Sequence, residues 1–483
     1  MQGDLRAAVR ETHTGLVALI GDRAFKTKKP VTTDFCDFST AELRERACRR
    51  EVELNRRLAP DSYLGVGFFM PPEGAAAEPV IVMRRYADSV RLASLVRSGG
   101  CVDEHLAAIA ARLARFHRSA LRGRRIDDQA TVDALSARWH ENLDELRRHV
   151  DAIIARDSLN EITRLTDQFL AGRGALFTHR IAHGRVVDGH GDLMSEDIFC
   201  MPDGPVLLDC LEFDDELRYV DGVDDAAFLA MDLEFLRRPD LADAFLGEYL
   251  RLTGDDAPIS LRHFYIAYRS VVRAKVDCIR VTQGHAEASV DARRHIDLAA
   301  EHLRKATVQL IVIGGGPGTG KTTLARALAE QMQAQVISTD DVRRELAQSG
   351  IIGGRVGDLD AGLYASENVA AVYDEVLRRA QSCLSMGSTA VVDGTWRDAH
   401  QRARAHRLGV TTASPVVDFT CALPLEEAAE RITARGRSAS DATPWIASAL
   451  GEFVVEGRSH PIDTARPITD SVDEAQRICC VSV

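Results

Sequence analysis

The sequence contains no run of about eighteen consecutive apolar residues and no pair of cysteines in a CxxC pattern. The first absence argues against a transmembrane helix, and the polar amino-terminal stretch MQGDLRAAVRETHTG does not resemble a secretory signal. The second absence, with ten scattered cysteines, predicts reduced thiols rather than a disulfide framework or a zinc site. We therefore expect a cytoplasmic protein with no membrane partner.

Positive charge is also in short supply, because the formal net charge is −12 at pH 7. This balance argues against a general nucleic-acid surface, so we expect no extended nucleic acid as a partner. The apolar fraction of 45% and the charged fraction of 27% are typical of a globular protein. A chain of 483 residues is too long for one ordinary core, which predicts two or three domains.

Lysine is by far the scarcer of the two basic residue types, lysine and arginine. Only six of the 60 basic residues are lysines, namely Lys26, Lys28, Lys29, Lys275, Lys305 and Lys321. Arginine carries a wide planar fork, whereas lysine is a compact charge on a thin stem. Lysine in this chain is therefore a candidate marker of places where a fork does not fit. Chance codon drift is the alternative, and it suffices for Lys305.

The pattern along the chain predicts two domains of different type. The segments GLVALI and RAFKTK read as two strands joined by a turn at Gly21 and Asp22. A helix over 40–58, a strand over 80–86, helices over 103–176 and a strand over 206–213 follow. Near residue 305 the pattern changes to alternating strands and helices, so the expected domains are 1–304 and 305–483.

The second domain opens with the strongest motif of the sequence. A buried-strand pattern, QLIVIGG, leads into a GxxxxGK[ST] loop and then into the helical pattern TTLARALAEQM. The loop's backbone amides and the helix start would cradle phosphates, Lys321 would reach the outer phosphates, and Thr322 would hold Mg²⁺. This context disfavours a turn without nucleotide. The predicted nucleotide-binding residues are Gly315, Gly316, Pro317, Gly318, Thr319, Gly320, Lys321, Thr322 and Thr323.

Two acids each follow a predicted strand of this domain. The carboxyl ends of parallel strands border a shared crevice, so both acids are expected to point into it. Asp393 is placed like a second metal ligand, and Asp340 begins a DDVRR segment. The domain resembles the small P-loop kinases that include polynucleotide, zeta-toxin and gluconate kinases. That resemblance implies that Asp340 is the base and Arg343 a phosphate or substrate clamp. The segment AAERITARGR fits a lid that closes over phosphates, which makes Arg435 a candidate nucleotide-binding residue. A helix N-cap for Asp340 and a solvated helix face for the arginines are the alternatives.

The first domain carries a second candidate site around HGDLMSEDIF, residues 190–199. An HxD segment followed five positions later by a metal ligand is the catalytic loop of kinase-like phosphotransferases. Asp192 would then be the catalytic residue, with Asp197 and Asp209 on the metal. Upstream, Lys26 or Lys28 with Glu51 offers the lysine and glutamate pair that positions the inner phosphates of ATP.

Residues 1 to about 300 resemble the aminoglycoside phosphotransferase-like kinases, on segments such as AFKTK, HGDL, DCLEF and DDAAFLAMDLE. The whole chain resembles bacterial proteins that join such a domain to a P-loop ATP-binding domain. Two departures stand out: no GxGxxG loop precedes the first hairpin, and Asp197 stands where an asparagine is usual. An active loop, a nucleotide-binding regulator and a structural relic remain open. Activity is favoured because three converging carboxylates would repel one another without a cation.

One helical segment, FYIAYRSVVRAKVDCIR, places Arg269 and Arg273 four residues apart on one face. These arginines are candidate ligands for an anionic substrate, and the alternative is an ion-paired helix face. His190 is interpreted as a packed brace of the loop rather than a proton carrier.

These patterns predict an α+β protein-kinase-like bilobal domain followed by an α/β P-loop NTPase domain. The expected activity is transfer of the γ-phosphoryl group of ATP, with Mg²⁺, to a small hydroxylated acceptor such as a sugar or amino sugar. The alternative makes the P-loop half the working kinase or an ATP-driven switch, with the first half a non-catalytic binding module. The sequence does not identify the acceptor or the oligomeric state.

Overall fold

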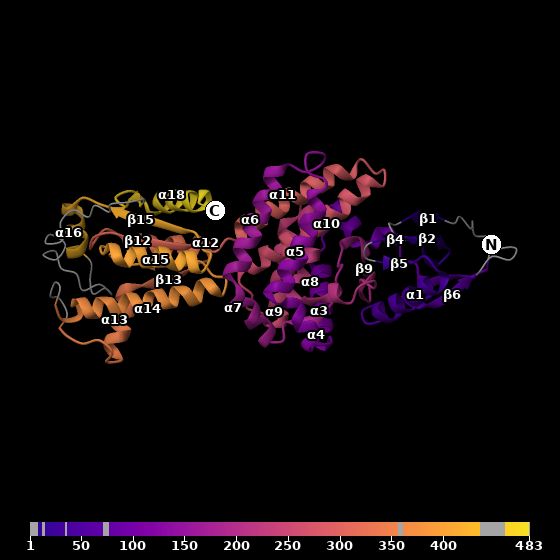
Figure 1. The fold of residues 1–483 in the computed structure, drawn as a ribbon, viewed down its shortest axis with the longest axis horizontal. Helices are drawn as coiled ribbons and strands as arrows, with labels where there is room; N and C mark the ends of the chain where they lie inside the picture. Colours follow the sequence, from indigo (N-terminus) through magenta and orange to yellow (C-terminus); the bar gives the residue numbers. More distant parts are fainter. Residues whose placement is uncertain are drawn as a thin grey trace. The chain divides into compact units, whose positions relative to one another are not determined.

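The computed structural model describes residues 8–11, 15–33, 36–70, 77–355, 361–434 and 459–482. The chain forms two compact units, whose elements are drawn in Figure 1. The first unit comprises Met1–Thr163, Phe177–Ala257 and Arg262–His302, and the second comprises Arg164–Leu176, Pro258–Leu261 and Leu303–Val483. The predicted boundary at 304 and 305 falls inside the last turn of helix α11 (Ala288–Ala306).

The first unit begins with an antiparallel sheet of five strands, in the order β1-β2-β3-β7-β6. Its strands are β1 (Ala8–Glu11), β2 (Gly15–Ile20), β3 (Arg23–Lys28), β6 (Tyr63–Phe69) and β7 (Glu78–Arg84). The predicted turn between β2 and β3 is present, and Gly21 has the positive φ of 58° that such a turn needs. Strands β1 and β6 were not predicted. A separate two-stranded ribbon pairs β4 (Thr32–Thr33) with β5 (Cys36–Asp37).

Helix α1 (Ala41–Asn55) packs against this sheet and carries Glu51, a predicted nucleotide-site residue. Thr40 caps the helix, because its hydroxyl accepts a hydrogen bond from the amide of Leu43. Cys48 and Val52 on the buried face of α1 meet Ile81 of β7 in one apolar cluster. This packing fixes the register between α1 and the sheet.

The rest of the first unit is mainly helical, with short strands that frame the HGDL segment. Strand β8 (Val186–Asp188) pairs with β11 (Tyr219–Asp221), and β9 (Ile198–Met201) pairs with β10 (Gly204–Leu207). The further elements are η1 (Asp88–Val90), α2 (Leu92–Arg97), α3 (Asp103–Ser119), α4 (Arg124–Asp127), η2 (Asp128–Ala130), α5 (Val132–Arg147), α6 (Arg156–Gly172), α7 (Gly174–Ala182), η3 (Ser195–Asp197), η4 (Glu216–Arg218), α8 (Gly222–Phe235), α9 (Pro239–Thr253) and α10 (Ile259–Thr282).

The predicted strand over 206–213 is wrong in its second half. Strand β10 ends at Leu207, and Asp209 has a φ of 65°, in the left-handed region that a strand does not contain. Aspartate tolerates this region better than most residues because its short side chain can bond locally. The chain therefore turns sharply at the residue that the sequence assigned to the metal.

The second unit contains a parallel sheet in the order β13-β14-β12-β15-β16, with helices on both faces. Its strands are β12 (Leu310–Gly314), β13 (Gln335–Ser338), β14 (Ala390–Asp393), β15 (Val416–Ala422) and β16 (His460–Asp463). Its helices are α12 (Lys321–Met332), α13 (Thr339–Gln348), η5 (Gly362–Tyr364), α14 (Ser366–Ser385), α15 (Ala399–Thr411), α16 (Leu425–Ala434) and α18 (Ile468–Val481). This arrangement is the predicted α/β fold.

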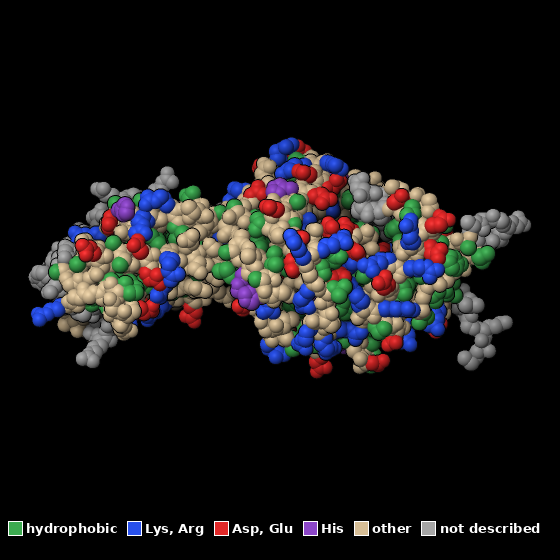
Figure 2. Space-filling view, turned by 60° about the horizontal axis from the view of Figure 1, so that its bottom comes forward, with side chains coloured by type: hydrophobic (Ala, Val, Ile, Leu, Met, Phe, Trp, Pro, Cys, Tyr) green, Lys and Arg blue, Asp and Glu red, His purple; other side chains and the backbone are tan. Residues whose placement is uncertain are grey.

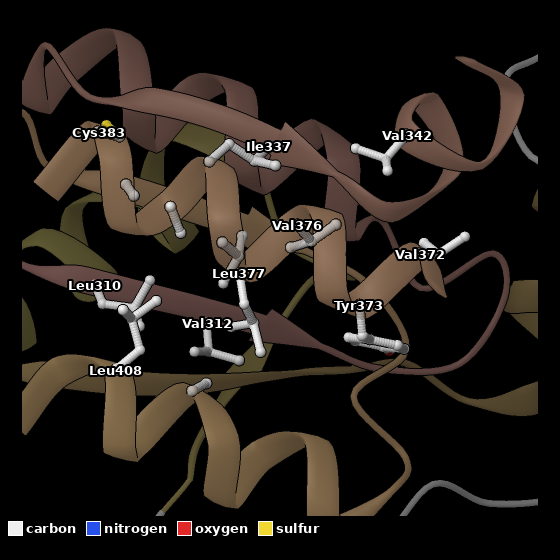
Figure 3. Packing of buried hydrophobic residues seen from close by; sticks show 14 of the residues in the cluster. Leu310, Val312, Ile337, Val342, Val372, Tyr373, Val376, Leu377, Cys383 and Leu408 are labelled. Atoms are coloured by element: carbon white, nitrogen blue, oxygen red, sulfur yellow. The ribbon is translucent and has the colours of Figure 1, made fainter. Parts of the chain in front are cut away.

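Alternate residues of β12 serve two separate apolar cores. Leu310 and Val312 join side chains of α13, α14 and α15 on one face, and Figure 3 shows the α14 side chains directed at them. Ile311 and Ile313 join side chains of α12 and α18 on the other face. A strand covered on both faces reads as a continuous apolar run, which explains why QLIVIGG was recognisable in the sequence.

No helix among the described residues is long and apolar enough to cross a membrane. On the face drawn in Figure 2, basic and acidic side chains are interspersed.

We expect Leu384→Ala to lower the free energy of unfolding of the P-loop unit by about 2–5 kcal/mol. Leu384 is fully buried on α14, so its removal leaves a cavity beside the sheet. Denaturant titration followed by tryptophan fluorescence measures the effect, because Trp396 lies in the same core. The control Val410→Ala, at a side chain that is 83% exposed, should change stability by less than about 0.5 kcal/mol. Equal effects of the two substitutions would contradict the assigned core.

Candidate nucleotide and catalytic sites

Glu51 on α1 is completely buried, and each of its two carboxylate oxygens faces a lysine of β3. Lys26 Nζ lies 2.8 Å from Oε1 and Lys28 Nζ lies 2.6 Å from Oε2. The two lysines are separated by one residue, so their side chains leave the same face of the strand. The structure thus brings together all three residues that the sequence proposed for the inner phosphates.

The two lysines differ in what else they contact. Lys26 Nζ lies 2.5 Å from Asp209 Oδ1, whereas Lys28 is bound to Glu212 and has a side chain only 1% exposed. Burial disfavours the charge of both lysines, but the neighbouring acids outweigh burial and raise the pKa of each. Lys26 is therefore the lysine that borders the predicted metal ligand, and Lys28 is enclosed by acids.

Asp225 on α8 binds the backbone of the HGDL segment. Its carboxylate accepts hydrogen bonds from the amides of His190 and Gly191, at 2.7 and 2.8 Å. It accepts a third from His117 Nε2, at 2.9 Å. Burial disfavours the charge of Asp225, but these interactions outweigh burial and lower the pKa of Asp225. Three donors thus fix the backbone of the loop immediately before Asp192.

His190 lies inside the loop as a packed residue. Its Nε2 is hydrogen-bonded to the carbonyl of Leu208 at 3.1 Å, and its Nδ1 lies 3.3 Å from the amide of Asp192. Burial lowers the pKa of His190, so the neutral ring is favoured. These contacts agree with a brace and leave no exposed imidazole for proton transfer to a ligand.

The far end of the loop is fixed by other charges. The amide and the hydroxyl of Ser195 both donate to Asp232 on α8, at 2.8 and 2.5 Å. Glu196 accepts from Arg97 Nη1 at 2.6 Å and from Arg91 Nη1 at 3.2 Å. The acid beside Asp197 therefore faces arginines and does not add an unpaired charge to the site.

Asp209 is held in its left-handed conformation by side chains from the amino-terminal sheet and α1. The amide of Asp209 donates to the hydroxyl of Tyr63 at 3.1 Å. The next amide, of Cys210, donates to Asn55 Oδ1 at 2.9 Å. Asp209 is in this way positioned by the same helix that carries Glu51.

The three carboxyl groups of the predicted catalytic and metal site influence one another. Burial raises the pKa of Asp192 to about 6. The positive charge of Arg273 opposes this rise, and the negative charge of Asp209 adds to it. Burial raises the pKa of Asp197 well above its ordinary value, and the negative charges of Asp209 and Asp192 raise it further. Burial also disfavours the charge of Asp209, yet Lys26 outweighs it and lowers the pKa of Asp209. Of the three carboxyls, only Asp209 thus has a pKa below its ordinary value.

This donor set suits Mg²⁺ bound together with a nucleotide. Among the residues that the structure describes, no three His, Cys, Asp or Glu side chains are grouped so as to hold a metal by themselves. Nucleotide-bound Mg²⁺ needs fewer protein ligands, since it typically takes one or two carboxylates with phosphate oxygens and waters. Asp197 and Asp209 would supply these oxygens, and the positive charge would favour the ionised form of both.

The two arginines proposed for substrate lie in different surroundings. Arg269 is 4% exposed, pairs with Asp224 at 2.7 and 2.9 Å, and donates to the carbonyl of Gly191. That is the ion-paired alternative, and it makes Arg269 a support of the loop. Arg273 Nε is buried without a hydrogen-bond partner in the described part of the chain, and its charge acts on Asp192. Substrate contact by Arg269 or Arg273 stays a prediction.

The P-loop of the second unit has the expected strand, loop and helix geometry. Gly320, at a φ of 86°, precedes the first residue of α12, which is Lys321. Lys321 Nζ donates to the carbonyl of Gly316 at 2.8 Å, inside the loop. The Thr322 hydroxyl donates to Asp393 Oδ2 at 2.7 Å, so the two predicted metal-binding side chains are neighbours. Thr323 lies on the same first turn with an exposed side chain.

Asp340 and Arg343 form an ion pair of 2.7 Å on the first turn of α13. The guanidinium of Arg343 also lies over the ring of Tyr364, 4.4 Å from its centre, and the residue is 8% exposed. Burial raises the pKa of Asp393, with Lys321 acting in the opposite direction and the charge of Asp340 adding to the rise. Asp340, Asp393 and Lys321 are thus electrostatic neighbours, while the clamp role of Arg343 stays a prediction.

Helix α16 packs directly against the P-loop. A side chain added at Gly318 would come within 2.5 Å of the carbonyl of Ala428, so glycine is needed at this close approach. Arg431 on α16 donates to the carbonyl of Thr464 at 2.9 Å and lies near Gly320. Arg435, the predicted lid residue, lies outside the described residues.

Several residues that build the sites were not singled out from the sequence. Glu212, three positions after Asp209, closes the acid network around Lys28, and it stood within the quoted DCLEF segment. His117 and Asn55 act through contacts more than a hundred residues away, and no local pattern marks them.

A family model described as an AAA domain matches residues 310–453. The uncharacterized protein Rv2004c of Mycobacterium tuberculosis is 56% identical over 471 residues, covering 97% of this chain and 95% of that protein. The chain belongs to the Rv2004c family. Within this family member, the predicted succession of an α+β unit and an α/β unit that carries the P-loop is confirmed.

Two solved structures are also similar to parts of this Rv2004c family member. The GDP and kanamycin complex of APH(2″)-IIia is 13% identical, with a TM-score of 0.40, and the match covers 62% of this chain and 94% of that one. A gluconokinase from Sinorhizobium meliloti is 18% identical, with a TM-score of 0.26, and the match covers 36% of this chain and 92% of that one.

We expect Asp225→Asn to lower the free energy of unfolding of the first unit by about 3–5 kcal/mol at neutral pH. The side-chain NH₂ of the introduced asparagine would point a hydrogen-bond donor at groups that are themselves donors. Because folding lowers the pKa of Asp225, its stabilising charge is complete above about pH 4, the value of an unfolded aspartate, and is lost as the pH falls towards the folded value.

Denaturant unfolding of wild type and Asp225→Asn between about pH 7 and pH 3 checks this expectation. The difference between the two should be constant at the upper end and shrink below about pH 4. The exposed neighbour variant Asp243→Asn serves as the control. A difference that grows in acid would contradict the assigned charge state.

Proposed function

We propose that the chain is a phosphotransferase that moves the γ-phosphoryl group of ATP to a hydroxyl group of a small molecule, in the first unit and with Mg²⁺. One observation carries the proposal: Lys26 contacts both Glu51 and Asp209, at 2.8 and 2.5 Å. A lysine joined to a helix glutamate and bordering a metal-binding aspartate is the arrangement that positions ATP phosphates in kinases.

Each residue of this site would have a separate role. Lys26 would contact the inner phosphates of ATP, and Glu51 would hold Lys26 extended towards them. Asp197 and Asp209 would hold Mg²⁺, which neutralises the negative charge of the phosphates when bound. Asp192 would contact the acceptor hydroxyl, within reach of the positive charge of Arg273. Rate enhancement would come from positioning and charge neutralisation, without a covalent enzyme intermediate.

In the proposed reaction, the acceptor oxygen forms a bond to the γ-phosphorus of ATP. The bond from that phosphorus to the bridging oxygen of ADP breaks, and the acceptor proton passes to Asp192. Sugars, amino sugars and aminoglycoside-like molecules are the acceptors that we propose, since they present hydroxyl groups on a small polar body.

A second candidate places the transfer in the P-loop unit. The neighbourhood of Lys321, Thr322, Asp393 and Asp340 supports it, because it joins a phosphate-binding loop to an acid that could take a hydroxyl proton. In that case the first unit would be a binding or regulatory module. A third outcome is ATP hydrolysis without an acceptor, which fits an ATP-driven switch.

Transfer from radiolabelled ATP to a panel of sugars, aminoglycosides and nucleosides separates these candidates. We expect Asp192→Asn to reduce acceptor labelling by about 10²–10⁴-fold, since it removes the proton acceptor. Lys321→Ala should leave labelling in the first unit measurable. The exposed acid Asp203, in the turn between β9 and β10, provides the control Asp203→Asn. Labelling that survives Asp192→Asn and disappears in Lys321→Ala would instead assign the transfer to the P-loop unit.

Asp197→Asn tests the departure from the usual asparagine. We expect the variant to keep maximal transfer within about threefold, because an amide oxygen can also bind Mg²⁺. The half-saturating Mg²⁺ concentration should rise, since one negative charge is lost from the site. Transfer rates measured over a Mg²⁺ series check both points. Complete loss of transfer in a folded variant would mean that Asp197 takes part in proton transfer.

A further inference from the structure

A cavity of about 270 Å³ lies in the first unit, against the residues that brace the HGDL loop. It is bounded by the end of α3, the segment 183–187, the start of α8 and the end of α9. No residue assigned to ATP, Mg²⁺ or the acceptor lines it. The volume is near the lower end of the range for small-molecule sites, so it suits a compact ligand.

The charged side chains of the cavity are mostly basic. Arg118, Arg122 and Arg185 line it, and Asp255 is its single acid. Asp255 is already bound by Arg180, with distances of 2.5 and 2.9 Å, although the same guanidinium also pairs with Asp221. The cavity therefore presents an excess of positive charge.

The three arginines keep their charge available to a ligand. Among the described residues, the side chain of Arg118 has no hydrogen bond or ion pair. Arg122 donates only to backbone carbonyls, of His117, Arg118, Ala120 and Gly184. Arg185 donates to two carbonyls and lies 3.6 Å from Asp255. Carbonyl groups carry no net charge, so an anion would meet the guanidinium groups of Arg118 and Arg122 without a carboxylate partner, whereas Arg185 is already paired with Asp255.

The wall of the cavity is continuous with the brace of the catalytic loop. Tyr249 and His117 both line the cavity, and the Tyr249 hydroxyl lies 2.8 Å from His117 Nδ1. The other nitrogen of His117 donates to Asp225, which accepts the amides of His190 and Gly191. A side chain at Gly222 would come within 2.5 Å of the Tyr249 hydroxyl, so this packing is tight.

We propose that this cavity is a second ligand site, which binds a small molecule bearing a phosphate group and acts on the catalytic loop through His117 and Asp225. Arginines recognise phosphate oxygens through paired N–H groups, and among the described residues those of Arg118 are bound to no other group. A bound ligand would hold Tyr249 and His117 in place and so fix the loop that carries Asp192. The binding stands independently of the proposed transferase activity, whereas the effect on turnover rests on it.

Calorimetry with two probes, inorganic phosphate and glucose 6-phosphate, tests the binding step. The titrations use the Lys321→Ala chain with saturating ATP analogue and Mg²⁺, so that neither nucleotide site takes up the probe. We expect Arg118→Glu to weaken binding by about tenfold or more, and the exposed Arg115→Glu, on the same helix, to leave it unchanged. Because the Arg118 side chain makes no bond in the described structure, its substitution should not disturb folding.

Binding of both probes with similar affinity would assign the site to free phosphate, and tighter binding of glucose 6-phosphate would assign it to a phosphate ester. Either result supports the site if Arg118→Glu weakens it. No binding of either probe, or equal binding by Arg118→Glu and Arg115→Glu, would overturn it.

Turnover of ATP by the chain with intact Lys321 tests the coupling. We expect the tighter probe to raise kcat about fivefold with little change in the KM for ATP, and His117→Gln to abolish that rise while probe binding persists. An unchanged kcat with the site occupied would overturn the coupling. If the wild-type chain turns over no ATP, the proposed function fails, and the titrations still decide whether the site exists.

Discussion

The carboxylate of Asp225 holds the loop that carries Asp192, on which the proposed transfer in the first unit depends. A buried charge is costly, yet here it receives two backbone amides and an imidazole, so its ionised form is favoured over the neutral one. Arginines hold the carbonyl side of the same backbone, because Arg57 donates to Asp188 and Gly189 and Arg269 donates to Gly191. The same carboxylate connects the front of the loop with His117 and the basic cavity behind it.

Lysine and arginine have separate tasks in this chain. Lys26 and Lys28 both contact the buried Glu51, and Lys321 contacts the P-loop carbonyl of Gly316; all three are predicted to serve phosphate sites. The buried arginines instead form two-point pairs with carboxylates, as Arg180 does with Asp221 and Arg269 with Asp224. A planar fork suits such paired contacts, and a point charge suits a narrow approach to a phosphate. The scarcity of lysine thus drew attention to three residues whose part in phosphate binding stays a prediction.

The sequence predicted the parts of the sites that lie on one element or one motif. The P-loop and its helix were recognisable because glycine spacing and a buried strand are local features. The pairing of Lys26 with Glu51 followed from a resemblance to kinases. The sharp turn at Asp209 was missed, because apolar residues around it continue the strand pattern and the turn is imposed by Tyr63 and Asn55 from distant segments. Contacts made by packing have no periodicity to detect.

Two nucleotide sites are predicted in one chain, one at Lys26 and one on the P-loop. Calorimetric titration with a non-hydrolysable ATP analogue and Mg²⁺ tests this prediction most directly. Two equivalents per chain are expected, one of which disappears in Lys321→Ala and the other in Lys26→Ala. A single equivalent that Lys321→Ala abolishes and Lys26→Ala leaves unchanged would contradict the account.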